Sequence, residues 1–243
     1  MRVCNADPTN VISQYDYAYD AVRCRVSCTK SGIAYKARDT NFYSYNARSE
    51  LTNAVSAVDS SCRFRYKFDD MGSRILAEER SVCSSYLSNQ LNQYSVIDGF
   101  TPRYYDDGNQ TLVKTREGVW NVLYNAENRP ILWSNESAVV KMRYDHEGRR
   151  VFKESQTKRG ADSYCFIYDH ENLIAVGLGT NSLAYVLRAP LAVGYEVPLA
   201  YISPSCESLF YMSDANRNIV GVVNAEDAIL NVANANLIVE RVA

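Results

Sequence analysis

A short aromatic phrase recurs along this chain at a nearly regular spacing, and this recurrence constrains the fold more than any other feature. The fullest copy, from Tyr144, reads Tyr-Asp-His-Glu-Gly-Arg-Arg-Val. The aromatic residues that open the copies are Tyr19, Tyr45, Phe68, Tyr104, Tyr124, Tyr144, Tyr168 and Tyr211. Successive positions differ by 26, 23, 36, 20, 20, 24 and 43 residues, and the two long gaps leave room for eroded copies, one of them at Tyr86. A fixed internal period of this length predicts a repeat architecture of about ten units.

The phrase has the residue types of a tight turn. Asp at the first turn position accepts a hydrogen bond from the backbone two residues on, and Gly at the fourth position adopts positive φ. Together they predict a hairpin with a three-residue loop and a bulge. The predicted turn residues are Asp20, Asp69, Gly72, Asp107, Gly108, Asn128, Asp145, Gly148, Asp169, Asn172 and Asp214.

Several copies lack glycine at the fourth turn position. Asn128 and Asn172 are residues that tolerate positive φ, whereas Arg23, Ser49 and Arg217 place a less tolerant side chain there. Such a residue costs on the order of 1 kcal/mol or more in the left-handed conformation. These copies predict either strained turns or a different loop.

The segments beside the turns alternate with the period of a β-strand. Residues 63–68 place three aromatic side chains on one face and three cations on the other, and residues 15–20 and 139–144 also alternate. Residues 165–168, 173–176, 183–187 and 219–223 are apolar at successive positions, which predicts strands covered on both faces. We therefore predict an all-β fold of consecutive antiparallel hairpins, forming a single repeat region over residues 1–243 with poorly defined ends at 1–14 and 232–243.

Composition excludes several classes of partner. The 243 residues carry a formal net charge of −2, so no basic field attracts nucleic acid, and no apolar run reaches the roughly 20 residues of a membrane span. The first ten residues lack the apolar core of a signal peptide, and we expect a cytoplasmic product as encoded.

No set of residues predicts catalysis or a cofactor. His146 and His170 occupy the same slot of two copies, so repeat descent with a structural or solvent-facing role explains them better than catalysis or metal binding. We expect buried thiols over disulfides or a metal site for the seven cysteines, because metal-ligand spacing is missing. These are Cys4, Cys24, Cys28, Cys62, Cys83, Cys165 and Cys206.

Trp120 and Trp133 admit two interpretations. They could stack on a sugar ring together with exposed tyrosines, or they could pack on a strand face. Packing is favoured, and carbohydrate is kept as a possible partner.

The phrase, its period of about 20 residues and the connecting segments resemble bacterial RHS proteins, also called YD-repeat proteins. Residues 168–175, Tyr-Asp-His-Glu-Asn-Leu-Ile-Ala, are similar to the YDGENLIAE segment that precedes the core-associated region of the family. The resemblance covers residues 15–231. It implies a strip of hairpins that winds spirally into a hollow shell around a C-terminal toxin, which is the encapsulated partner.

The chain departs from the family in two respects. The self-cleavage motif Asp-Pro-x-Gly-Leu is absent, so no residue inherits a catalytic role and we expect no enzyme activity. Drifted turns and abrupt ends predict a truncated or remnant member. Open sheet edges would then pair with other RHS-shell segments or with a second copy. The alternative function is a module that binds carbohydrate or a cell surface.

Overall fold

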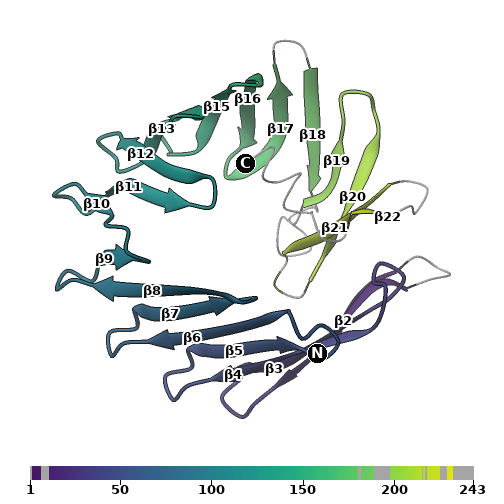
Figure 1. Ribbon diagram of the computed structural model, residues 1–243. Coiled ribbons are helices and arrows are strands. Elements are labelled where there is room, and N and C mark those ends of the chain that lie inside the picture. Colours follow the sequence, from purple (N-terminus) through teal and green to yellow (C-terminus); the bar gives the residue numbers. More distant parts are fainter. Residues whose placement is uncertain are drawn as a thin grey trace. The chain divides into compact units, whose positions relative to one another are not determined.

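The computed structural model describes residues 2–6, 11–179, 182–188, 198–214, 216, 218–224 and 229–231. Every regular element within these ranges is a β-strand (Figure 1), which confirms the all-β prediction. The chain divides into two compact units, residues 1–102 with 214–216 and residues 103–213 with 217–243. That residues 1–243 form a single repeat region stays a prediction, and the end at 232–243 lies outside the described residues.

The first unit holds a nine-stranded sheet whose strand order follows the chain. Each strand pairs antiparallel with the next, as in Tyr17↔Cys28 and Tyr66↔Ala77. The strands are β1 (Arg2–Ala6), β2 (Val11–Tyr19), β3 (Arg25–Ser31), β4 (Asp39–Tyr45), β5 (Leu51–Ser56), β6 (Arg63–Phe68), β7 (Arg74–Glu79), β8 (Val82–Ser88) and β9 (Tyr94–Ile97).

The second unit holds a thirteen-stranded sheet of the same kind, again in chain order. Its strands are β10 (Arg103–Tyr104), β11 (Gln110–Thr115), β12 (Gly118–Tyr124), β13 (Pro130–Ser134), β14 (Ala138–Tyr144), β15 (Arg150–Thr157), β16 (Gly160–Asp169), β17 (Asn172–Leu178), β18 (Ser182–Arg188), β19 (Pro198–Ile202), β20 (Ser208–Ser213), β21 (Ile219–Asn224) and β22 (Ile229–Asn231). The prediction of consecutive antiparallel hairpins is therefore confirmed in both sheets.

In most of the repeated hairpins the register shifts at the aromatic residue that opens the phrase. In β14 and β15, Arg143 pairs with Phe152 whereas Tyr144 pairs with Arg150, so one residue of β15 is extra. The same shift occurs beside Tyr45 and Tyr124. A bulge of this kind bends the strand and increases its twist.

The two ends of the strands carry different turns. The repeated phrase forms the turns at one end of each sheet. At the other end are short loops such as Arg80–Ser81, Arg116–Glu117 and Lys158–Arg159, each closed by one cross-strand pair. A chain that meanders antiparallel places successive turns at alternate ends, so the period of the phrase equals one hairpin.

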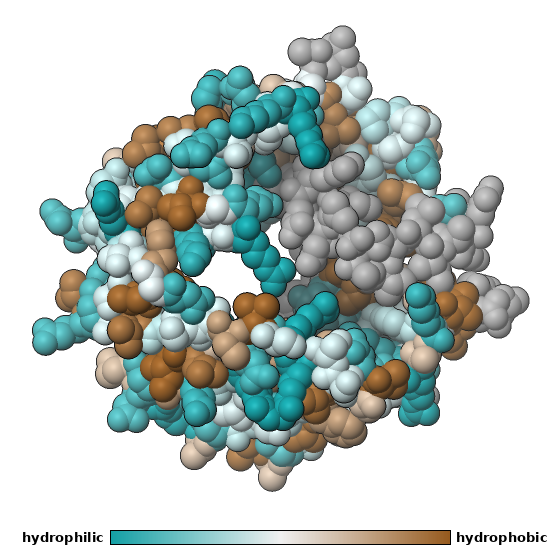
Figure 2. All heavy atoms as spheres, viewed as in Figure 1, coloured by the Kyte–Doolittle hydropathy of each residue, from teal (hydrophilic) through white to brown (hydrophobic). Residues whose placement is uncertain are grey.

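Burial alternates along many strands, as a sheet with one covered face requires. Phe64, Tyr66 and Phe68 of β6 are half-buried, and the cations between them are exposed. In the second sheet the buried side chains include Trp120, Val122, Met142, Phe166 and Val176. Hydrophobic groups on the face shown in Figure 2 are scattered among hydrophilic ones.

The prediction of two covered faces is wrong for part of the second sheet. Ile167 is 45% exposed, and Tyr185 and Leu187 are 51% and 52% exposed. In β21, by contrast, Val222 and Val223 are buried although they point to opposite faces. An apolar residue at every position therefore does not by itself show that a strand is covered on both sides.

Candidate functional site

Eight turns share one pattern of backbone hydrogen bonds. The N–H of the first residue donates to the carbonyl of the fifth, and the N–H of the fourth donates to the carbonyl of the first, at 2.8 to 3.2 Å. The fourth residue has φ between 59° and 89° in all eight. The first residues are Asp20, Asn46, Asp69, Asn89, Tyr105, Asn125, Asp145 and Ser203. The Ser203 turn joins β19 to β20, at the opposite end of its sheet from the others in that sheet.

The side chain at the first position fixes the turn. Oδ1 of Asp145 accepts hydrogen bonds from the backbone N–H of Glu147 at 3.0 Å and of Arg149 at 2.9 Å. Oδ1 of Asn125 accepts from the equivalent N–H groups at 3.0 and 2.9 Å. An uncharged amide oxygen can therefore replace the carboxylate, because only one acceptor atom is needed.

Three predicted turn residues need comment. Asp107 and Gly108 are the third and fourth residues of the turn that begins at Tyr105, and Oδ1 of Asp107 accepts from Asn109 at 3.1 Å. Oδ1 of Asp214 accepts from the N–H of Asn216 at 2.8 Å. Arg217 lies outside the described residues.

The prediction of positive φ at Asn172 is wrong. Asp169 pairs directly with Asn172 across the two-residue loop His170–Glu171, and His170 has the positive φ of 50°. This loop is one residue shorter than the loop of the other copies. The residue with positive φ is therefore the second residue of the turn here, and not the fourth. This copy has the same Tyr-Asp-His-Glu residues as the copy at Tyr144, but the two strands of its hairpin pair differently.

Arg23 and Ser49 keep the left-handed geometry, with φ of 68° and 61°. Replacing Arg23 by glycine removes this strain, so we expect the free energy of unfolding to rise by about 0.5 to 1 kcal/mol. Urea denaturation of the purified protein measures the change. Arg23→Ala keeps the Cβ and is the matched control, which should gain less. A loss of stability in Arg23→Gly would contradict the assigned backbone conformation.

In four copies, the repeated tyrosine connects its hairpin to the preceding one. The hydroxyl of Tyr144 donates to the carbonyl of Pro130 at 2.9 Å, and that of Tyr168 donates to the carbonyl of Arg150 at 3.0 Å. Tyr45 and Tyr124 make the same bond to the residue that follows the preceding turn, at 2.8 and 2.9 Å. Burial raises the pKa of all four hydroxyls, which keeps them protonated as donors.

Removing one of these hydroxyls should have a measurable cost. Tyr144→Phe leaves the ring in place and leaves the Pro130 carbonyl without its donor, so we expect a loss of about 1 to 2 kcal/mol in unfolding free energy. Tyr105→Phe is the control, because Tyr105 is 46% exposed. Equal effects of the two substitutions in urea denaturation would contradict the connecting role.

The other predicted repeat aromatics have different surroundings. Phe68 lacks a hydroxyl, and Tyr19 is 42% exposed. Tyr104 ends β10 at the register shift. Tyr211 is half-buried in β20, and burial raises the pKa of its hydroxyl to about 12.

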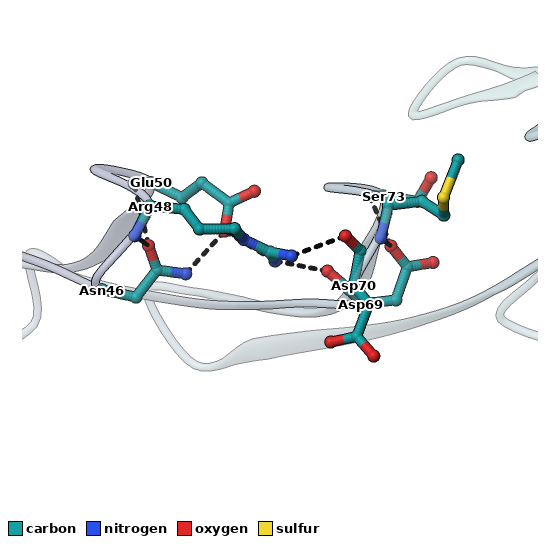
Figure 3. A network of polar contacts seen from close by, with 7 residues as sticks. Asn46, Arg48, Glu50, Asp69, Asp70 and Ser73 are labelled. Atoms are coloured by element: carbon teal, nitrogen blue, oxygen red, sulfur yellow. Dashed lines mark hydrogen bonds and ion pairs between the residues drawn. The ribbon is translucent and has the colours of Figure 1, made fainter.

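Arginine side chains join successive turns. Arg48 donates from Nη1 to the carbonyl of Asp70 at 2.6 Å and from Nη2 to the carbonyl of Asp69 (Figure 3). Arg149 reaches the carbonyl of His170 in the same way. These bonds satisfy carbonyl groups of the next turn, so the turns of neighbouring hairpins hold one another.

The carboxylates of the repeated turns are stabilised by hydrogen-bond donors within the same turn. Glu50 accepts from Asn46 and Arg48, and these hydrogen bonds lower the pKa of its carboxyl. Burial acts to raise the pKa of Asp145, but hydrogen bonds from Arg149 outweigh it and the net pKa is lowered. Both carboxylates are thus held in their charged form as structural acceptors.

The two histidines, which are the candidates for acid–base catalysis, lie in separate turns and are exposed to solvent. The side chains of His146 and His170 are 85% and 93% exposed, each with a carboxylate oxygen at 3.9 Å. Among the described residues, no three His, Cys, Asp or Glu side chains are grouped to hold a metal ion. Nor does this part of the chain contain a helix long and apolar enough to cross a membrane.

Among the six cysteines whose side chains are described, the prediction of buried thiols is correct for Cys28 alone. Cys24 and Cys62 are half-buried, whereas Cys83, Cys165 and Cys206 are exposed. All six are free thiols, and the side chain of Cys4 lies outside the described residues. The prediction is wrong for the exposed residues because strand alternation or a turn directs them to solvent, as with Cys206 at the fourth position of its turn.

A groove on the second sheet is lined by residues of five strands, β11 to β15. Its volume is about 610 Å³, and it is lined by Thr115, Arg116, Glu117, Trp120, Pro130, Trp133, Val140, Met142, Tyr144, Arg150 and Lys153. The two indole rings meet edge to face, with centroids 6.3 Å apart and planes at 66°. Trp120 is 7% exposed, and its Nε1–H donates to Oγ1 of Thr115 at 3.1 Å. Trp120 packs on the strand face as expected, whereas the cations beside it were not predicted.

No protein-family model and no curated protein matches the sequence. The chain is structurally similar to crystal structures of TcdB2-TccC3 (TM-score 0.43, 9% identity, covering 90% of this chain and 15% of that chain) and TcdB2-TccC3-Cdc42 (0.35, 12%, 94% and 17%). It is also similar to TcdB2-TccC3 without the hypervariable C-terminal region (0.36, 12%, 94% and 17%). This chain thus spans 15% to 17% of the chains to which it is similar.

Proposed function

We propose that this chain is a non-enzymatic wall segment of an RHS-type shell that encloses a polypeptide toxin. The observation that carries the proposal is the repeated unit itself: one turn geometry in seven copies, a tyrosine bond to the preceding hairpin in four copies and strand order that follows chain order. Such a unit extends a sheet by adding identical hairpins, which is how a continuous wall can be built from a linear repeat. The resemblance of its phrase to YD repeats supports the RHS assignment.

The chemistry of the exposed residues agrees with a structural role. The charged groups of the repeated turns bind backbone groups or one another, as Arg48 and Arg149 do. The self-cleavage motif of the family is absent from the sequence. That the chain is a truncated or remnant member stays a prediction, as does its location in the cell.

A wall segment should associate through its outermost strands. Among the described strands, β9 is the last one of the first sheet and pairs with β8 alone. An unpaired edge recruits another strand, and a charge placed in it prevents this pairing. We expect light scattering to show oligomers of the natural sequence and smaller species for Val96→Lys in β9. Val58→Lys, in an exposed loop, is the control.

Enclosure is tested with a disordered reporter peptide fused to the chain. In the associated form the reporter should resist an added protease, and in Val96→Lys it should be digested rapidly. Digestion at one rate in both forms, or a natural chain that stays a monodisperse monomer at high concentration, would contradict the proposal.

A further inference from the structure

We propose that the groove around Trp133 binds an acidic peptide segment, in which a carboxylate is flanked by apolar side chains. The anionic group is inferred from the groove itself. The choice of a peptide rests on the proposed function, because a shell wall faces a polypeptide. The groove is built from β11 to β15 with the loop at Arg116–Glu117.

Two cations reach the groove because of the bulge after the turn. Tyr144 pairs with Arg150, and Met142 pairs with Lys153. Tyr144 and Met142 lie two residues apart and share a face, so Arg150 and Lys153 share that face as well. Their odd spacing of three residues would place them on opposite faces of a regular strand. The register shift therefore brings both positive charges to the groove.

Neither cation is neutralised by an acid in the described part of the chain. Nε of Arg150 is buried and has no hydrogen-bond partner there, and its Nη1 has the Met142 sulfur at 3.9 Å. The side-chain ammonium of Lys153 has no hydrogen bond or ion pair with a described residue. Burial and the charge of Arg150 lower the pKa of Lys153, the direction expected for a partly buried cation lacking an anion.

The charge of the lining favours an anion. Arg116, Arg150 and Lys153 are its cations, and Glu117 is its one carboxylate among the described residues. The chain as a whole carries a formal net charge of −2, so this positive charge is local. A carboxylate between Arg150 and Lys153 would supply the missing acceptor through charge-assisted hydrogen bonds.

The rest of the lining favours apolar groups over a sugar. Pro130, Trp133, Val140 and Met142 offer carbon and sulfur atoms. The hydroxyl of Tyr144 already donates to Pro130, and Trp120 is too buried to present its ring face. Sugar hydroxyls would find few partners in this apolar part of the lining, whereas apolar side chains beside a carboxylate carry no polar group that would be left unpaired.

Tryptophan fluorescence tests this proposal, because both tryptophans of the chain line the groove. The probe is acetyl-Leu-Asp-Leu-Glu-Leu-amide, which has no aromatic residue, titrated into the full chain. The neutral peptide with Asn and Gln in place of the acids is its counterpart. We expect a saturable change in emission with the acidic peptide and binding at least about tenfold weaker with the neutral one.

Variants locate the binding. Arg150→Gln and Lys153→Gln should each weaken binding about tenfold, and Arg150→Lys should keep most of it. Lys141→Gln is the control, because Lys141 pairs with Glu154 on the opposite face and its loss should change binding by less than about twofold. Circular dichroism confirms that each variant is folded.

The outcomes separate this proposal from the proposed function. Titration of Val96→Lys measures the groove without assembly, and protection of the fused reporter measures enclosure without the groove. Equal binding of the acidic and neutral peptides would overturn the proposal. So would unchanged binding in Arg150→Gln and Lys153→Gln, or a response to oligogalacturonate with none to the acidic peptide.

Discussion

Replacing Trp120 by alanine should lower the free energy of unfolding by about 3 to 5 kcal/mol. Trp120 is among the largest buried side chains of the second sheet and packs against Trp133. Truncation removes this contact, leaves a cavity across β12 and β13 and frees the Thr115 hydroxyl. The described strands of this sheet form few fully buried positions, so little else compensates.

Urea denaturation followed by circular dichroism measures this loss, and the emission of Trp133 reports the same sheet in the variant. Trp120→Phe keeps an aromatic ring and should lose clearly less. If Trp120→Ala lost under about 1 kcal/mol, the indole would not be packed as its burial indicates.

Replacing Gly32 by alanine should cost about 3 kcal/mol or more, through two causes that add. Gly32 follows β3 with φ of 114°, which a residue with a Cβ adopts only under strain. In addition, a Cβ there would lie 2.5 Å from the carbonyl oxygen of Ile12. That neighbour is backbone of β2, so it cannot rotate away as a side chain would.

Gly99→Ala isolates the first of these causes. Gly99 has φ of 75°, and no atom lies within 4 Å of the position of its Cβ, so its substitution should cost only about 1 to 2 kcal/mol. Hydrogen exchange should show β2 and β3 opening more readily in Gly32→Ala than in Gly99→Ala. Similar exchange in both would mean that β2 does not approach Gly32 closely.

The repeated phrase predicted the hairpins because its chemistry is local. Asp145 and Gly148 need only each other and the intervening backbone to form their turn. Asn89 begins the turn of the eroded copy expected at Tyr86, although Asn89 itself was not among the predicted turn residues, and Ser203 begins a turn of the same geometry that was not predicted. Asn89 could have been recognised from Asn92, three residues on, since Asn tolerates the φ of 59° that it adopts.

The groove could not be predicted in the same way because it depends on register. Arg150 and Lys153 share a face only because a bulge interrupts the alternation of β15. The sequence predicted a bulge at the turn and the pairing of consecutive strands, but it does not show which residue of β15 is the extra one, and so which later residues share a face. The same limit applies to Asn172, where a loop shorter by one residue changes the pairing.

Backbone nuclear Overhauser contacts across the repeated turns test the central claim, that each copy of the phrase bends the chain between neighbouring strands. The structure predicts contacts between Arg143 and Phe152 across the Asp145 turn, and between Leu132 and Lys141 from one hairpin to the next. Contacts of helical spacing within residues 144–151, or contacts of Arg143 only with strands distant in sequence, would contradict it.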